Sequence, residues 1–64
     1  MAALPEMDLK IIEFAREHGR ATMADVVRVT GANRNTLKVR LRSLVEGRHL
    51  ARHGTGKGSW YGVE

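Results

Sequence analysis

The chain has 64 residues, no cysteine and a net charge of +4 at pH 7, with a sequence pI near 10.4. This length leaves room for one domain, and the lack of cysteine excludes disulfides and cysteine-ligated zinc fingers. No apolar run approaches the ~20 residues of a membrane span, and the N-terminal residues lack the charged-then-apolar pattern of a secretory signal. We therefore expect a cytoplasmic protein whose small core holds the fold by packing alone.

The charge is distributed unevenly along the chain. Residues 1–33 carry four basic and five acidic side chains, whereas residues 34–64 carry seven basic and two acidic ones. Such asymmetry is typical of proteins with a polyanionic partner, and it favours nucleic acid over an acidic membrane surface. A basic protein without such a partner is the alternative that charge leaves open. A nucleic-acid partner would place the protein on the nucleoid.

Residues 8–18 are predicted to form the first helix, after an N-terminal arm over residues 1–6. Periodic apolar residues form one side of this helix, and charged residues form the other. The apolar side consists of Ile11, Ile12, Phe14 and Ala15. Glu6 and Asp8 suit the positive N-terminal end of the helix dipole, and Gly19 supplies a left-handed stop. The next two residues form a short connector to the second helix.

A second, short helix is predicted over residues 22–30. Thr22 is the expected N-cap, and Asp25 completes a capping box in which aspartate replaces the usual glutamate. Val26 and Val27 fall on the side expected to be buried. Gly31 ends the helix, because glycine adopts the left-handed conformation found at helix C-termini.

A third helix is predicted over residues 33–46, with Asn33 as its N-cap and Gly47 as its stop. At about 100° per residue, one narrow apolar stripe predicts the side of this helix that enters the core. The stripe consists of Leu37, Leu41 and Leu44, with Val45 at its edge. The opposite side carries Asn35, Val39, Arg42 and Ser43, with Arg34 and Lys38 on one shoulder and Arg40 on the other.

Residues 49–63 are predicted to form a β-hairpin around a glycine-rich loop. The favoured register pairs Gly54 with Ser59. This register places three apolar side chains together on one face, namely Leu50, Tyr61 and Val63. Pairing His53 with Ser59 instead would separate Leu50 from the other two. In the favoured register Trp60 falls on the opposite face.

Residues 25–37 resemble the helix-turn-helix segment of bacterial transcription regulators. The small apolar residue, the turn glycine, the polar cap and the buried aliphatic of that pattern are Val27, Gly31, Asn33 and Leu37. Thr30 departs from it, because that position is more often apolar. With the preceding helix and the following hairpin, residues 8–63 are similar to the winged helix-turn-helix superfamily. The resemblance implies a small α+β fold, a three-helix winged helix-turn-helix with a C-terminal β-hairpin wing.

The same resemblance implies that the protein binds double-stranded DNA, in transcription regulation or as a DNA-binding accessory module, without being an enzyme. The third helix would enter the major groove, where asparagine can contact adenine and arginine or lysine can contact guanine. Its base-contacting residues would be Arg34, Asn35, Lys38 and Arg42. Val39 either contacts a thymine methyl group or is an exposed valine without a role. Phosphates would be contacted by Asn33, Arg52 and Lys57, with Arg40 and Arg48 as further candidates.

Other kinds of site fit these residues less well. The glycine-rich loop lacks the serine or threonine that follows the lysine of a phosphate-binding loop, and no helix follows it. His49 and His53 would lie about 13 Å apart along a strand, which is too far for both to hold one metal ion. No catalytic constellation can be assembled from the chain. We therefore expect no catalytic residue, no cofactor and no metal.

Two other functions stay open. Exposed Val39 and Trp60 would favour a winged helix that binds other proteins in a larger complex, and Trp60 with Tyr61 would favour a binder of left-handed DNA. Dimerisation usually needs an apolar stripe beyond the core, and none is visible here. We expect a monomer in free solution, which pairs only on DNA or through a segment not present here.

Overall fold

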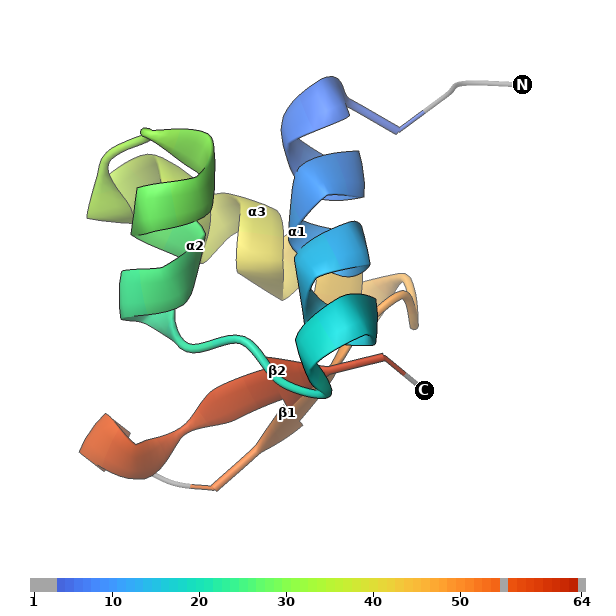
Figure 1. The fold of residues 1–64 in the computed structure, drawn as a ribbon, viewed down its shortest axis with the longest axis vertical. Helices are drawn as coiled ribbons and strands as arrows, with labels where there is room; N and C mark the ends of the chain where they lie inside the picture. The colour runs from blue at the N-terminus through green and yellow to red at the C-terminus, as the bar shows by residue number, and fades with distance from the viewer. Residues whose placement is uncertain (1–3, 55, 64) are drawn as a thin grey trace.

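The computed structural model describes residues 4–54 and 56–63 and shows three helices followed by a β-hairpin (Figure 1). The elements are α1 (Glu6–His18), α2 (Met23–Thr30), α3 (Arg34–Glu46), β1 (Ala51–His53), the 3₁₀ turn η1 (Gly56–Gly58) and β2 (Trp60–Gly62). α1 and α2 lie side by side with α3 behind them, and the hairpin crosses the end of the bundle where α1 finishes and α2 begins. The chain therefore has the expected small α+β fold, with the hairpin in the position of a wing.

α1 begins at Glu6, two residues before the start that the sequence predicted. Pro5 explains the earlier start, because its φ of −56° suits a helix N-terminus and its carbonyl accepts the Leu9 N–H at 3.2 Å. The helix ends at the expected left-handed glycine, Gly19, with φ +81°. Its predicted apolar side faces the core, with Ile11 and Ala15 buried and Ile12 and Phe14 half-buried.

The start of α2 is fixed by a reciprocal pair of hydrogen bonds. Thr22 Oγ1 accepts the Asp25 N–H at 3.2 Å, and the Thr22 N–H donates to Asp25 Oδ2 at 3.1 Å. The predicted capping box is confirmed. The pKa of Asp25 is lowered from its ordinary value, chiefly by the hydrogen bond from the Thr22 backbone and further by the nearby Arg28.

The turn between α2 and α3 depends on one glycine and one hydroxyl. Gly31 is left-handed with φ +73°, as predicted, and its N–H donates to the Val27 carbonyl at 2.8 Å. Thr30 donates its hydroxyl hydrogen to the Val26 carbonyl at 2.7 Å and accepts the Ala32 N–H at 3.2 Å. These two bonds explain why a polar residue occupies the position that is apolar in the helix-turn-helix pattern, since the hydroxyl ties α2 to the turn.

α3 begins at the predicted cap, because Asn33 Oδ1 accepts the N–H three residues further on at 2.9 Å. The predicted leucine stripe is confirmed, and all three of its members are buried: Leu37, Leu41 and Leu44. The helix ends at Glu46 as expected, but Gly47 keeps φ −81° and Arg48 is the left-handed residue, with φ +63°. The N–H groups of Gly47 and Arg48 bond to the last carbonyls of the helix, so the reversal falls one residue later than predicted.

The hairpin has the predicted register. β1 and β2 pair antiparallel, with Ala51, Arg52 and His53 opposite Gly62, Tyr61 and Trp60 respectively. One step further along this register, Gly54 stands opposite Ser59. Leu50 is buried and Tyr61 is half-buried on the face toward the helices.

A third segment pairs with the hairpin, and the sequence had predicted only a connector there. The Ala21 N–H donates to the Tyr61 carbonyl and the Tyr61 N–H donates to the Ala21 carbonyl, both at 2.8 Å. Ala21 is fully buried. The segment that joins α1 to α2 therefore holds β2 in place, and this contact sets the position of the hairpin beside the helices.

The core contains one charged side chain. Its apolar members are Ile11, Ala15, Ala21, Val26, Leu37, Leu41, Leu44 and Leu50. Asp8 is equally buried. Arg40 of α3 donates two hydrogen bonds to the Asp8 carboxylate, from Nε to Oδ1 at 2.8 Å and from Nη2 to Oδ2. The hydrogen bond to Asp8 raises the pKa of Arg40 above its ordinary value. Asp8 lies in the first turn of α1, where the sequence placed it, but it also pairs with an arginine of another helix, which the sequence analysis did not predict.

Candidate nucleic-acid interface

The side of α3 that faces away from the core carries two parallel rows of side chains. Residues four apart are neighbours along a helix face. The first row, the cationic stripe, consists of Arg34, Lys38 and Arg42, and the second, the outer stripe, consists of Asn35, Val39 and Ser43. All six are exposed, and 63% of Val39 is accessible to solvent. The buried leucines fix this orientation, because a helix with one face in the core must present the opposite face to solvent.

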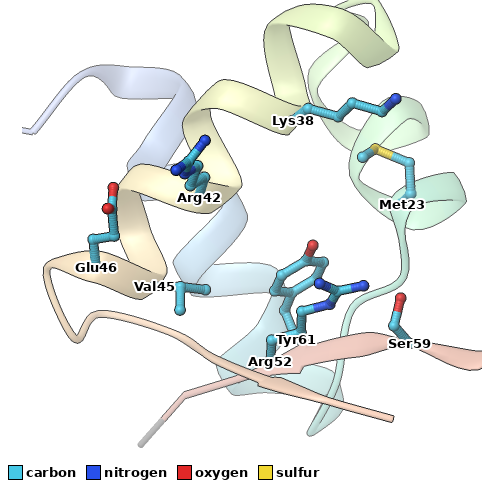
Figure 2. A pocket seen from close by; sticks show the side chains of 8 residues that line it. All are labelled: Met23, Lys38, Arg42, Val45, Glu46, Arg52, Ser59 and Tyr61. Carbon is cyan, nitrogen blue, oxygen red and sulfur yellow. The ribbon is translucent and has the colours of Figure 1, made fainter. Parts of the chain in front are cut away.

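A groove of about 500 Å³ lies between α3 and the hairpin (Figure 2). Its lining residues come from α2, α3 and the hairpin: Met23, Lys38, Arg42, Val45, Glu46, Arg52, Ser59 and Tyr61. Arg52 and Tyr61 are directly opposite each other on β1 and β2, and the Arg52 guanidinium lies beside the Tyr61 ring. The groove therefore has an apolar floor and a rim that carries three cations and one carboxylate.

A second hollow, of about 450 Å³, continues the groove toward the N-terminus of α3. It is lined by Thr22, Met23, Ala24, Arg34, Gly56 and Ser59. Met23 and Ser59 line both hollows, so the hollows are adjacent, and we call the two together the trough. The whole cationic stripe lies along one wall of the trough, and Arg52 lies on the other.

The cations of the trough have no acidic partner in the part of the chain that the structure describes. The ion pairs there join Lys10 to Glu6, Arg28 to Asp25, and Arg40 to Asp8. None of the three involves the cationic stripe or Arg52. The lining of the trough holds four cations and one carboxylate, Glu46, so its excess charge is positive, and a concave surface with such an excess attracts anions. The trough is therefore suited to a phosphate-bearing ligand.

The structure separates the residues that the sequence grouped as one DNA-contacting set. Arg34, Lys38, Arg42 and Arg52 line the trough, whereas Asn35 and Val39 lie on the outer stripe. Asn33 is exposed, but its side-chain oxygen caps α3. Arg48 is exposed in the turn after α3. Lys57 belongs to η1, and the prediction for its side chain lies outside what the structure describes.

Arg40 has a partner within the fold. It lies on the shoulder of α3 that faces α1, where its Nε and Nη2 groups donate to Asp8 and 29% of its side chain stays exposed. The sequence contained a signal for this pair. Asp8, Ile11 and Ala15 are spaced by three and four residues, so they share one helix face. A carboxylate in line with two buried apolar residues predicts a buried partner.

Trp60 lies on the face of the hairpin that is turned away from the trough, because strand neighbours alternate between faces. It is half-buried and stacks on His53, with ring centroids 4.3 Å apart and an angle of 24° between the planes. Arg20 stands over the same indole, with Cζ 6.0 Å from the ring centroid. Trp60 therefore lies on the face opposite Tyr61, as the predicted register requires.

Comparison with known proteins gives a family but no activity. The family described as "Bacterial protein of unknown function (DUF977)" matches residues 4–62. The chain belongs to this family. No curated protein and no solved structure matches the chain. Within residues 4–54 and 56–63, no three potential metal ligands come together, and no helix is long and apolar enough to cross a membrane.

Proposed function

We propose that this protein binds double-stranded DNA, with α3 in the major groove and the hairpin on the flanking sugar–phosphate backbone. The observation that carries the proposal is the trough, whose lining holds three cations of α3 and one of β1, none of them in an ion pair with a described residue. The resemblance of residues 25–37 to helix-turn-helix regulators supports the same function. Two helices braced by the Gly31 turn present the outer side of α3 in the way that this mode of binding requires.

The protein would act as a binding module without catalysis, in transcription regulation or as an accessory to a larger DNA-binding assembly in the cytoplasm, on the nucleoid. We expect one monomer per binding site. Sedimentation at tens of micromolar, with and without a duplex that carries two adjacent sites, measures this directly. A stable dimer without DNA would contradict the expectation and would point to the exposed side of α1, where Leu9 is 47% accessible.

A salt titration tests the proposed function. Four phosphate-contacting cations predict that log affinity for a random-sequence duplex falls against log salt concentration with a slope of about −4. Arg16→Ala is the matched control, because Arg16 is an exposed arginine of α1 outside the trough, and its removal is expected to leave the slope unchanged. A slope near zero, or no binding at low salt, would contradict DNA binding.

A winged helix that binds other proteins remains the second candidate, and exposed Val39 is the observation in its favour. The same titration separates the two functions, since a protein-binding module has no reason to bind duplex DNA in a salt-dependent way. Left-handed DNA loses its main support, because Trp60 lies on the face away from α3.

A further inference from the structure

We infer that the outer stripe of α3 determines sequence preference and selects A·T base pairs, while the cationic stripe and Arg52 are committed to one sugar–phosphate strand in the trough. This inference rests on the proposed function. The sequence assigned Arg34, Asn35, Lys38 and Arg42 together to base recognition. The inference instead assigns the outer stripe to the bases and the cationic stripe to the backbone. In particular, it moves Arg42 from the bases to the backbone.

The geometry of α3 separates the two stripes. Successive residues are rotated by about 100° around a helix, so Asn35 points about 100° away from Arg34 and Val39 about 100° away from Lys38. Arg42 points within about 20° of Asn35, but it lies about 10 Å further along the axis and lines the groove beside the hairpin. Arg34, Lys38 and Arg42 line the trough together with residues of the hairpin, whereas Asn35, Val39 and Ser43 line neither hollow. The outer stripe therefore projects past the rim of the trough, in the direction opposite to the buried leucines.

The shape of a duplex assigns the trough to a backbone strand. Major and minor grooves alternate along B-DNA, and a single sugar–phosphate strand separates each pair of neighbouring grooves. If α3 enters the major groove and the hairpin lies toward the adjacent minor groove, the strand between the grooves must run between α3 and the hairpin. That space is the trough.

The spacing of the cations matches such a strand. From Arg34 to Arg42 the helix rises by about 12 Å, at 1.5 Å per residue. Phosphates rise by about 3.4 Å each along the duplex axis and are further apart along the strand itself, so about two or three of them fall alongside the cationic stripe. Arg52 faces the same strand from β1. The cations therefore lie close enough together to contact neighbouring phosphates of one strand.

With the cationic stripe on the backbone, the outer stripe is left for base contacts, and its side chains favour adenine and thymine. An asparagine amide forms paired hydrogen bonds with N6 and N7 of adenine, and an apolar side chain contacts the thymine methyl group. Asn35 and Val39 are about 6 Å apart along the helix axis, which corresponds to about two base-pair steps. Ser43 can bond to either kind of pair. The outer stripe contains no arginine or lysine, the side chains that make the commonest contact with guanine.

The test measures affinity for three short duplexes that share their flanks and differ in a central block, which is A·T, G·C, or A·T with uracil in place of thymine. Uracil lacks the 5-methyl group. The native protein is expected to prefer the A·T block over the G·C block by about tenfold. It is expected to lose about threefold in affinity when thymine becomes uracil.

Three variants assign the effects to residues. Asn35→Ala is expected to abolish most of the preference for A·T over G·C, and Val39→Ala to bind thymine and uracil duplexes equally. Arg42→Ala is expected to weaken all three duplexes by the same factor and to make the salt slope less negative by about 1. Thermal melting of each variant checks that these exposed substitutions leave the fold intact.

Two results would overturn the inference while leaving DNA binding in place. One is equal affinity of the native protein for the A·T and G·C duplexes. The other is a change in preference caused by Arg42→Ala but not by Asn35→Ala or Val39→Ala. If instead none of the duplexes binds at low salt, DNA binding itself is wrong and the inference fails with it.

Discussion

Arg40 and Arg42 lie two residues apart on α3 and have opposite surroundings. Arg40 faces α1, where it neutralises the fully buried Asp8. Arg42 faces the hairpin, where it is exposed and has no ion-pair partner among the described residues. The two shoulders of α3 thus show that identical side chains on one helix can hold a fold together or remain free for a ligand. The difference lies in what the neighbouring element supplies, which is a carboxylate on one side and another arginine on the other.

The largest expected effect is a loss of stability on removal of Arg40, the arginine of α3 that pairs with Asp8. Arg40→Ala leaves the Asp8 carboxylate buried without a partner, which is strongly destabilising in a domain with a small core. The melting temperature is expected to fall by roughly 15 °C, as followed by circular dichroism. Arg28→Ala is the control, since it breaks an ion pair whose arginine side chain is 73% exposed. That variant should change the melting temperature by at most about 2 °C. Equal effects of the two substitutions would contradict the comparison.

Substitution of the exposed Arg42 is expected to reduce DNA binding without reducing stability. Arg42→Glu places a carboxylate in the trough and is expected to reduce affinity for duplex DNA by more than about tenfold at moderate salt. Its melting temperature should stay close to that of the native protein, because the side chain is exposed. Arg16→Glu makes the same change of charge on α1 and should cost less than about threefold, since only long-range repulsion remains. Similar losses for both variants would mean that net charge, rather than the trough, determines binding.

A smaller effect comes from the acidic residue that caps α2. The pKa of Asp25 is lowered from 3.8, first by the hydrogen bond from the Thr22 backbone. A carboxylate whose pKa is lowered by folding stabilises the protein at pH values above its ordinary pKa. This stabilisation is lost as the pH falls through the folded-state pKa. Asp25→Asn keeps the shape of the side chain but cannot titrate. The stability difference between the native protein and this variant should therefore shrink below about pH 4. A difference that is constant from pH 7 to pH 2 would contradict this role.

Local signals in the sequence account for most of the fold. The capping box at Thr22, the Gly31 turn, the Asn33 cap and the leucine stripe each act within a few residues, and all appear in the structure as predicted. The hairpin register follows equally from the alternation of Leu50, Tyr61 and Val63. In each case the physical cause is contained in the segment itself.

The features that could not be predicted depend on contacts between distant segments. Asp8 and Arg40 are 32 residues apart, and the spacing of Asp8 with Ile11 and Ala15 indicates a buried partner without indicating which residue supplies it. The pairing of Ala21 with Tyr61 likewise joins a two-residue connector to the last strand. The trough follows from that pairing, because it places Arg52 opposite the cationic stripe. The sequence therefore predicted that the side of α3 away from the core is exposed, but not that the cationic stripe and Arg52 line hollows beside the hairpin.

We propose that duplex DNA contacts the side of α3 that carries Arg42 and not the side on which Arg40 pairs with Asp8. Nitrogen-15 NMR of the arginine Nε–Hε groups tests this directly, with a short duplex added to the labelled protein at low salt. The Arg42 and Arg52 signals are expected to shift as DNA is added, while the Arg40 signal, held by Asp8, stays in place. Alanine variants of each arginine assign the signals. A shift of Arg40 without shifts of Arg42 and Arg52, or no shift of any of the three, would contradict the account.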